Sequence, residues 1–227
     1  MSFDDETLAI FQTQVEIMLP GLLKLRESSV EWGRHSDWPW NGFVLSYSTL
    51  GGSANWEKRI GPIYDAQYGW TVLAALSIEE RSARFAVLGN PRYRKKISVW
   101  LGQSYVRIEH SGGPPAIRSG YEACASAQAR IDYIRSFPGF GEKYGRNIPM
   151  DRYDELVRNH FALDHRLKTV LSDCGYSKVN YSVGETLLCH LAGQLGIDAW
   201  TLDRVIYGRF SQLREALSRR QGNPEVR

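Results

Sequence analysis

The sequence predicts an all-α protein, and three observations support that fold class. Through most of the chain, beginning with residues 4–18, apolar residues recur three or four positions apart, which is the spacing of one helix face. Capping signals precede several of these segments; in Ser77–Glu80 a serine is followed three residues later by a glutamate. Only residues 43–50 and 105–109 have the short apolar pattern that a strand could share.

In the first half of the chain, proline, glycine and tryptophan separate the predicted helices. The helix over residues 4–18 is expected to end before Pro20, because proline in a helix interior removes a hydrogen bond and crowds the preceding turn. Residues 32–40 are predicted to form a loop, and Ser53 is the expected N-cap of the next helix. Helical spacing then continues over residues 69–108.

In the second half, glycine and proline mark the helix boundaries. Residues 112–115 break the helical pattern, and Pro149 is expected to interrupt a helix that begins near Glu142. Asp151 and Asp154 are then typical caps for a further helix. Helices are predicted over residues 120–135, 151–158, 164–172, 182–195 and 198–207, with a last helix that fades into a polar tail.

The composition excludes several classes of protein. With 43% hydrophobic and 23% charged residues, the 227-residue chain is globular rather than disordered. No apolar run approaches the roughly 18 residues of a membrane span, and the N-terminus is acidic where a signal peptide is basic. Cys124, Cys174 and Cys189 form no C-x-x-C pair, which disfavours a disulfide framework and a closed metal site. We expect a cytoplasmic protein with no cofactor, no metal and no membrane partner.

Charge gives a weaker indication of the partner. The net charge is +3. The surplus lies in residues 130–227, and a separate basic cluster consists of Arg92, Arg94, Lys95 and Lys96. Such a cluster is either a solvated surface or a contact for a polyanion, and charge alone leaves both possibilities open.

The most specific local motif is Ser136-Phe-Pro-Gly-Phe-Gly-Glu-Lys-Tyr-Gly145. Pro138 cannot continue a helix, Gly139 and Gly141 can adopt positive φ, and a second helix begins near Glu142. Consecutive backbone N–H groups at such a helix start form an anion site that holds a phosphate without reading base sequence. The alternative is a glycine-rich helix connection that binds no ligand.

Asp164 follows Gly141 by 23 positions, within Phe-Ala-Leu-Asp-His-Arg-Leu. The motif and this aspartate together resemble the helix–hairpin–helix DNA glycosylase family, whose hairpin has the form L-P-G-[VI]-G-x-K and whose catalytic aspartate lies in a [VL]-D-x-x-[VIL] context. The resemblance implies two helical subdomains that flank a DNA-binding cleft, with the hairpin motif at about residues 130–148. It divides the chain into residues 1–42 packing on the core, a glycosylase-like domain over residues 43–217, and a polar tail over residues 218–227.

The resemblance implies a chemical role for two residues. Lys143 falls on the lysine of the bifunctional members, which form a Schiff base with the sugar and act as abasic-site lyases. Asp164 falls on the aspartate that stabilises the oxocarbenium-like sugar or deprotonates the attacking group. Without the resemblance, Lys143 is a solvated lysine that contacts phosphate and Asp164 is the N-cap of the next helix. The two roles of Asp164 are compatible.

Other residues are expected to contact the DNA or the extruded base. The hairpin supplies Gly139, Phe140, Gly141 and Arg146. Residues 45–55 resemble the family's L-S-x-[QST] helix start, and from them Ser48 and Asn55 are expected to reach DNA. The candidate walls of the base pocket are Trp38, Trp40, Tyr207 and Phe210, of which the tryptophans are also typical core anchors.

The resemblance implies a monomeric base excision repair enzyme that flips a damaged base out of double-stranded DNA. Its partner is duplex DNA with a damaged base or an abasic site, so the protein is expected to be nucleoid-associated when bound. The chain lacks the four-cysteine iron–sulfur motif of the endonuclease III branch, which favours 8-oxoguanine as the substrate. The alternatives are a non-catalytic helix–hairpin–helix DNA-binding module, a monofunctional glycosylase for alkylated bases, and a helical scaffold without a DNA role.

Overall fold

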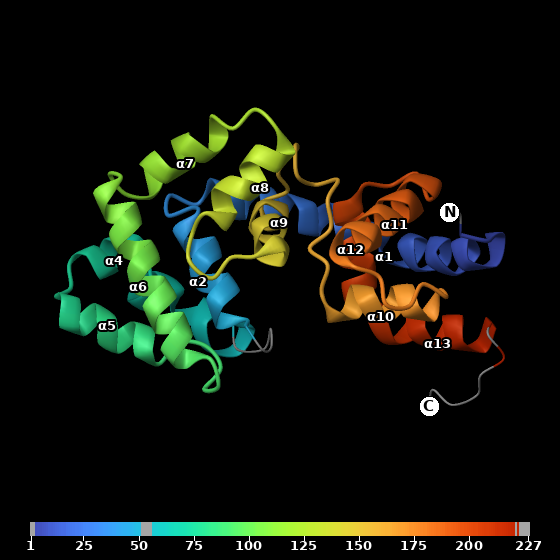
Figure 1. Ribbon diagram of the computed structural model, residues 1–227, viewed down its shortest axis with the longest axis horizontal. Coiled ribbons are helices and arrows are strands. Elements are labelled where there is room, and N and C mark those ends of the chain that lie inside the picture. The colour runs from blue at the N-terminus through green and yellow to red at the C-terminus, as the bar shows by residue number, and fades with distance from the viewer. Residues whose placement is uncertain (1–2, 51–55, 221, 223–227) are drawn as a thin grey trace. The chain divides into compact units, whose positions relative to one another are not determined.

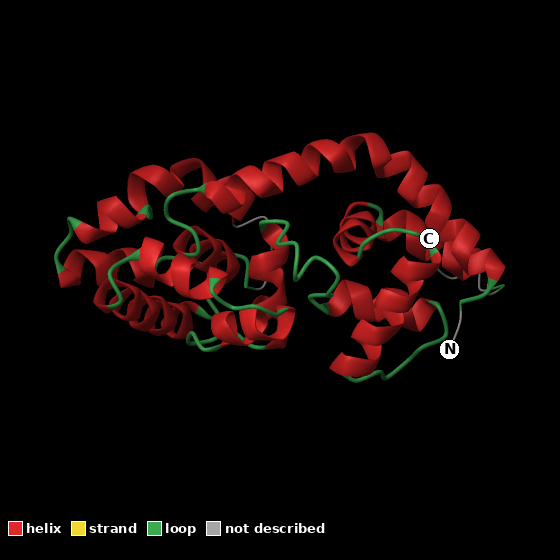
Figure 2. Ribbon diagram, turned by 90° about the horizontal axis from the view of Figure 1, so that it is seen from above, coloured by secondary structure: helices red, strands yellow, loops and turns green. Residues whose placement is uncertain are grey.

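The computed structural model describes residues 3–50, 56–220 and 222, and every regular element in that part of the chain is a helix. Figure 1 shows the helices in chain order, and Figure 2 shows the same ribbon as helices and loops without a strand. The all-α prediction is therefore confirmed.

The helices follow one another through short connections. In chain order they are α1 (Asp5–Arg34), α2 (Trp40–Ser48), a π-helical turn (Trp56–Ile60), a 3₁₀ turn (Gly61–Ile63), α3 (Tyr64–Gln67), α4 (Trp70–Ala74), α5 (Ile78–Ala86), α6 (Arg94–His110), α7 (Pro114–Glu122), α8 (Ala127–Arg135), α9 (Glu142–Asp151), α10 (His165–Asp173), α11 (Tyr181–Gln194), α12 (Ala199–Gly208) and α13 (Phe210–Arg220).

The chain divides into two compact units. The central unit is Glu31–Arg152, and the terminal unit combines Met1–Val30 with Tyr153–Arg227. The first boundary falls inside α1, so this helix contributes residues to both units. These boundaries differ from the predicted division at residues 42 and 217.

The core of the central unit is unusually aromatic, and α2 lies within it. Eight of the nine residues of α2 are buried. Its first residue, Trp40, packs against the rings of Trp70 and Tyr105, with centroids 5.8 Å from each. A helix that is covered on all sides carries apolar residues all round. This explains the apolar run from residue 43, where the sequence allowed a strand; residues 43–48 belong to α2 instead.

The terminal unit has a separate core of aliphatic side chains from α10–α13, which Phe3 and Phe11 from the N-terminal segment complete. Its helices begin at capping side chains: Asp164 for α10, Asn180 for α11 and Asp198 for α12 each accept a hydrogen bond from a backbone N–H of the first turn. Such a cap satisfies one of the donors that a helix start leaves unpaired, and it contributes about 1 kcal/mol.

Two prolines do not end their helices as predicted. α1 continues through Pro20 to Arg34, so the loop predicted over residues 32–40 is shorter and begins after Arg34. α9 likewise contains Pro149 and ends two residues later, at Asp151. A proline removes one backbone hydrogen bond. In α9 the last turn is fixed instead by the burial of Ile148, Pro149 and Met150.

Other predicted boundaries also need correction. A helix was predicted over residues 151–158, but residue 151 ends α9 and residues 152–158 form turns; Asp154 Oδ1 accepts the N–H groups of Leu156 (3.0 Å) and Val157 (3.3 Å) within such a turn. The continuous pattern over residues 69–108 is three helices, α4, α5 and α6, and residues 105–109 belong to α6 rather than to a strand. Ser53, the expected N-cap, lies outside the described residues.

Among the described residues, α1 is the one helix that is long and apolar enough to cross a membrane, and its apolarity is borderline. A single helix of this kind near the N-terminus is no sign of a membrane protein.

Candidate nucleic-acid interface

A turn over residues 136–141 joins α8 to α9, which pack on each other within the central unit. Gly139 has φ +78°, the left-handed region that favours glycine, as predicted. Gly141 has φ −93° and ψ −161°, an extended conformation open to any residue, so positive φ was wrong there. The turn therefore needs glycine for backbone conformation at one of the two positions.

The inner side of this turn is held by aromatic side chains. The hydroxyl of Tyr47 donates a hydrogen bond to the carbonyl of Pro138. Its ring stacks on Phe140, with centroids 4.6 Å apart and planes 17° apart. Trp100 of α6 covers Gly139 so closely that a Cβ there would lie 2.5 Å from the indole Cδ2. Because the backbone is pinned from inside, the turn is ordered before any ligand arrives.

Phe140 is 5% exposed. Its side chain is part of the core and does not reach DNA. The residue remains in the interface only through its backbone.

The outer side of the turn presents unpaired N–H groups. Within the described residues, no acceptor meets the N–H of Gly139 or of Gly141. α9 also starts without a side-chain cap, whereas α8 before it is capped by Ser126. Free donors at a helix start, together with the positive end of the helix dipole, form a site for an anion. The local arrangement expected for a phosphate site is thus present.

Lys143 is the second residue of α9 and is half-buried. Its Nζ lies 5.0 Å from the ring centroid of Tyr144, and it forms no ion pair with a described residue. A cation over an aromatic face is held by the ring quadrupole while its outer side stays accessible. The amine thus follows the turn by two residues, and no carboxylate of the described residues pairs with it.

Arg146 is not available to DNA, contrary to the prediction. It is 7% exposed. Its Nη1 lies 2.5 Å from Glu142 Oε2, while Arg135 of α8 holds the other oxygen of Glu142 at 2.8 Å. An arginine that is buried and bonded to a carboxylate joins the helices rather than binding a phosphate.

Three further predicted contacts are also wrong because the side chains are buried. Trp38 and Trp40 are completely buried in the core, and a ring without exposed surface cannot stack on an extruded base. Ser48 is buried as well, with its hydroxyl donating to the carbonyl of Leu45 at 2.8 Å. Asn55 lies outside the described residues.

In the terminal unit, Asp164 is the N-cap of α10, as its sequence context predicts. Its Oδ1 accepts the N–H of Leu167 at 3.1 Å. The preceding residues are fixed by α11: Tyr181 accepts the N–H of Leu163 at 3.0 Å and donates to the carbonyl of Phe161 at 2.9 Å. Asp164 is half-buried, and no described residue bonds its second oxygen, Oδ2. One oxygen caps, and the other is left for another partner.

Tyr207 and Phe210, the candidate pocket walls of the terminal unit, differ in exposure. Tyr207 is 45% exposed, and the guanidinium of Arg166 lies 4.3 Å from its ring centroid. Phe210 is half-buried against the aliphatic core. Arg166 is two residues after Asp164, on the helix that the aspartate caps, and Tyr207 is on α12, so the stacked pair forms a flat, polar-edged surface in the same unit as the aspartate.

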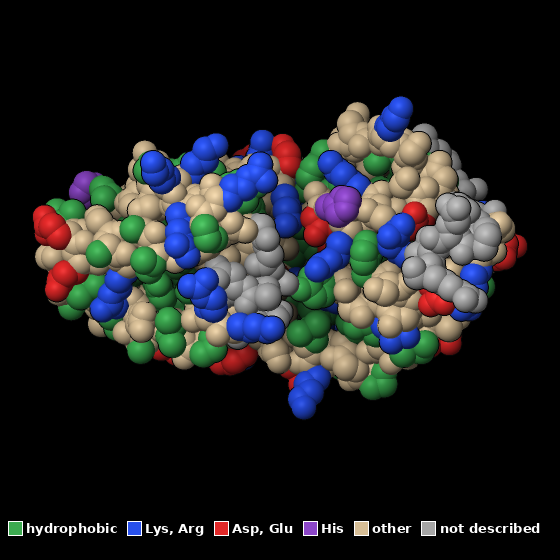
Figure 3. Space-filling model, turned by 90° about the horizontal axis from the view of Figure 1, so that it is seen from below, with side chains coloured by type: hydrophobic (Ala, Val, Ile, Leu, Met, Phe, Trp, Pro, Cys, Tyr) green, Lys and Arg blue, Asp and Glu red, His purple; other side chains and the backbone are tan. Residues whose placement is uncertain are grey.

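The space-filling view in Figure 3 shows basic side chains spread over one face of the central unit, drawn at the left. A shallow hollow of about 640 Å³ lies along α6, lined by Gly102, Gln103, Val106, Arg107, His110 and Ser111. No carboxylate or thiol lines it. Within the described part of the chain, no cluster of three or more histidine, cysteine or acidic residues has a metal-binding arrangement.

Sequence reasoning missed the residues that hold the turn from inside. Trp100 covers Gly139, Ser104 Oγ lies 3.5 Å from the hydroxyl of Tyr47, and Arg107 bonds the carbonyl of Ser136. These three residues lie four and three positions apart on α6, which is the spacing of one helix face. The spacing indicates that these residues share a face of the helix, but it does not indicate that this face contacts the turn.

Comparison with known proteins finds no matching family model, no matching curated protein and no matching solved structure.

Proposed function

We propose that the protein is a DNA N-glycosylase with abasic-site lyase activity that excises an oxidised purine, with 8-oxoguanine favoured, from flipped-out DNA. The observation that carries the proposal is the ordered turn before α9: the N–H groups of Gly139 and Gly141 have no acceptor among the described residues, and Lys143, which forms no ion pair there, follows Gly141 by two residues. The half-exposed Asp164 at the start of α10 supports it.

In this proposal the turn binds a phosphate of the DNA backbone. Backbone N–H groups recognise the phosphodiester without reading the bases, as a repair enzyme that must scan many sequences requires. The contact fixes the strand while the damaged nucleotide is extruded, which costs a few kcal/mol of unstacking.

The resemblance assigns Lys143 of the central unit and Asp164 of the terminal unit each a step on the sugar of the extruded nucleotide. As the bond between C1′ and the base nitrogen breaks, the base leaves with the bonding pair and positive charge develops on the sugar, which the Asp164 carboxylate stabilises. The Lys143 amine, in its neutral form, bonds to C1′ and loses a proton as the sugar ring opens to a Schiff base. Loss of a proton from C2′ expels the 3′ phosphate, and water hydrolyses the Schiff base to regenerate the lysine.

The second candidate is a non-catalytic DNA-binding module that uses the turn for phosphate contact alone. The observation in its favour is that Asp164 has an assigned structural task, since its Oδ1 caps α10. This module binds damaged duplex but releases no base and forms no covalent intermediate.

The test is to trap the Schiff base. Incubation with an abasic-site duplex and borohydride should yield a covalent protein–DNA adduct, and Lys143→Gln should abolish it while retaining duplex binding. Lys24→Gln is the matched control, because it removes an exposed lysine of α1. An undiminished adduct in Lys143→Gln would remove this lysine from the mechanism, and wild-type binding without adduct or base release would favour the module.

A substrate panel tests the base preference. 8-Oxoguanine should be released faster than thymine glycol or 3-methyladenine from matched duplexes. If 3-methyladenine leaves fastest, the protein is a glycosylase for alkylated bases instead.

A further inference from the structure

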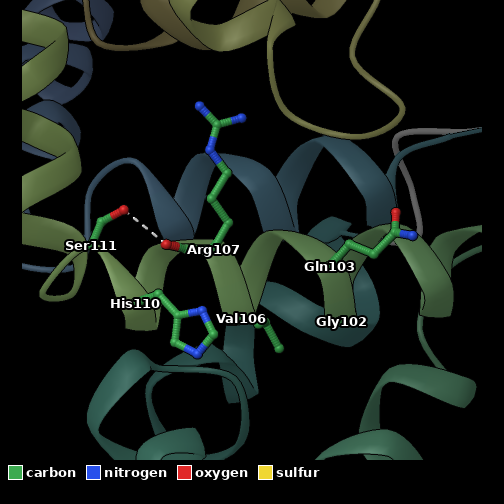
Figure 4. A pocket seen from close by; sticks show the side chains of 6 residues that line it. All are labelled: Gly102, Gln103, Val106, Arg107, His110 and Ser111. Carbon is green, nitrogen blue, oxygen red and sulfur yellow. Dashed lines mark hydrogen bonds between the residues drawn. The ribbon is translucent and has the colours of Figure 1, made fainter.

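Arg107 of α6 contacts the start of the turn, 29 residues further along the chain. Its Nη1 donates to the carbonyl of Ser136 at 2.6 Å, and its Nη2 donates to the hydroxyl of the same residue at 2.9 Å. Its guanidinium carbon lies 3.9 Å from the ring centroid of Phe137. In Figure 4 the Arg107 side chain leaves α6 on the side opposite to Val106 and His110.

This geometry depends on a guanidinium rather than on positive charge alone. The planar fork reaches two acceptors of Ser136 at once, and the same plane stacks on the Phe137 ring. A lysine at this position has the charge but neither the fork nor the flat face. The hydroxyl of Ser136 in turn donates to the carbonyl of Tyr133 at 2.6 Å, so the contact extends into the last turn of α8.

Arg107 and Tyr47 bond two carbonyls of the turn, one on each side of Phe137. Arg107 holds that of Ser136 and Tyr47 holds that of Pro138. With these carbonyls occupied and Trp100 against Gly139, the N–H groups of Gly139 and Gly141 are left without an internal partner. The direction of the free donors is thus set by the groups that hold the carbonyls.

We propose that Arg107 is a positioning residue for the DNA backbone site: it orders the turn from behind, and it contributes to phosphate binding through that order rather than by touching the phosphate. This rests on the proposed function for its DNA part. The alternative is that Arg107 is one more surface cation that pairs with a phosphate directly. The positioning role predicts that Arg107→Lys weakens duplex binding, whereas a direct phosphate contact predicts that Arg107→Lys retains it.

The first experiment needs no DNA. Amide hydrogen exchange is followed at Phe137 and Phe140, whose N–H groups donate to the carbonyls of Ile134 (3.1 Å) and Phe137 (3.3 Å). Wild type is compared with Arg107→Lys and Arg107→Gln, with thermal unfolding to verify that each variant folds. Both variants should exchange about tenfold faster or more at these amides, since each loses hydrogen bonds to a charged group. Arg84→Lys is the control, because Arg84 also donates to a carbonyl, that of Gln67 at 2.6 Å, away from the turn. Unchanged exchange at the turn would overturn the proposal.

The second experiment measures duplex binding against salt by fluorescence anisotropy. Arg107→Lys should bind about tenfold more weakly than wild type with the same salt slope, because charge is preserved and order is lost. If Arg107→Lys binds duplex as tightly as wild type, and Arg107→Gln lowers the steepness of log K against log salt by about 1, Arg107 contacts a phosphate directly and the positioning role is refuted. Wild type that shows no salt-sensitive binding would refute the proposed function, and the exchange result would still decide whether Arg107 orders the turn.

Discussion

Replacing Gly139 with alanine perturbs the turn at the residue that has the least room. At φ +78° an L-residue is strained by about 1–2 kcal/mol. The new Cβ would also lie 2.5 Å from Cδ2 and 2.6 Å from Cε3 of Trp100, distances that force the indole or the backbone to move. Such overpacking adds about 1–3 kcal/mol. We therefore expect a loss of about 2–5 kcal/mol of unfolding free energy and a fall of roughly 4–20 °C in Tm.

Gly141 provides the matched control. Its φ of −93° suits any residue, and a Cβ there meets no described atom within 4 Å. Gly141→Ala should therefore keep the unfolding free energy within about 0.5 kcal/mol of wild type. Because the methyl group would occupy the open space in front of the free N–H groups, duplex affinity should fall all the same. Gly139→Ala is thus expected to lower the unfolding free energy, whereas Gly141→Ala is expected to lower duplex affinity alone.

Urea unfolding monitored by tryptophan fluorescence is a suitable assay, because six of the seven tryptophans belong to the central unit. Fluorescence anisotropy with a labelled duplex measures binding of the folded variants. If Gly139→Ala is as stable as Gly141→Ala, neither the strain at Gly139 nor the contact with Trp100 limits the turn, and the reasoning fails. If Gly141→Ala retains full affinity, the turn is not the phosphate site.

Three further outcomes are expected. Asp164→Asn should keep its cap and its stability within about 0.5 kcal/mol but lose base release, whereas Asp164→Ala should also lose about 1 kcal/mol of unfolding free energy; equal base release by Asp164→Asn and wild type would exclude a catalytic carboxylate. Burial raises the pKa of Tyr47 and Tyr64 well above 10.0. The folded state then retains phenol protons that the unfolded chain releases, so the unfolding free energy should fall above about pH 10 by up to about 1.4 kcal/mol per pH unit for each tyrosine. Urea midpoints that stay constant from about pH 9 to about pH 11 would contradict this. Burial also raises the pKa of the Cys174 thiol to about 12. At pH 8 this lowers the thiolate fraction more than about a thousandfold relative to free cysteine, and the higher nucleophilicity of the more basic thiolate offsets part of that loss. In a variant with the other cysteines replaced by serine, the thiol should therefore react with a thiol reagent roughly a hundredfold more slowly than free cysteine; an equal rate would show that the thiol is not shielded.

Predictions from sequence were right where the deciding interaction is local. The Ser77 capping box forms as predicted. The backbone N–H of Ser77 donates to the Glu80 carboxylate at 2.8 Å, and the Ser77 hydroxyl accepts the N–H of Glu80 at 3.2 Å. Asp164 caps α10 for the same reason. Both signals lie within three residues of the bond that they predict, and tertiary packing does not alter them.

The failures arise where burial in the core decides. Trp38 and Trp40 were assigned to a pocket because aromatic rings stack on bases, but such rings are even more effective in a core, and these two are fully buried. The contact between Arg107 and Ser136 spans 29 residues and that between Tyr47 and Pro138 spans 91. No local pattern encodes pairings at that separation, so the motif could be recognised while its supports could not.

Arg146 is buried, and its role is to bind Glu142 rather than a phosphate. A free Glu142 at the first position of α9 would favour the helix dipole but repel a phosphate at the same end. Both of its carboxylate oxygens are instead occupied, one by Arg146 and one by Arg135. The acidic side chain is thereby turned to the packing between α8 and α9 and its charge is balanced there. The N–H groups of the turn can then attract an anion although a glutamate stands beside them, and the arginine that sequence alone assigns to the phosphate serves that attraction from inside the fold.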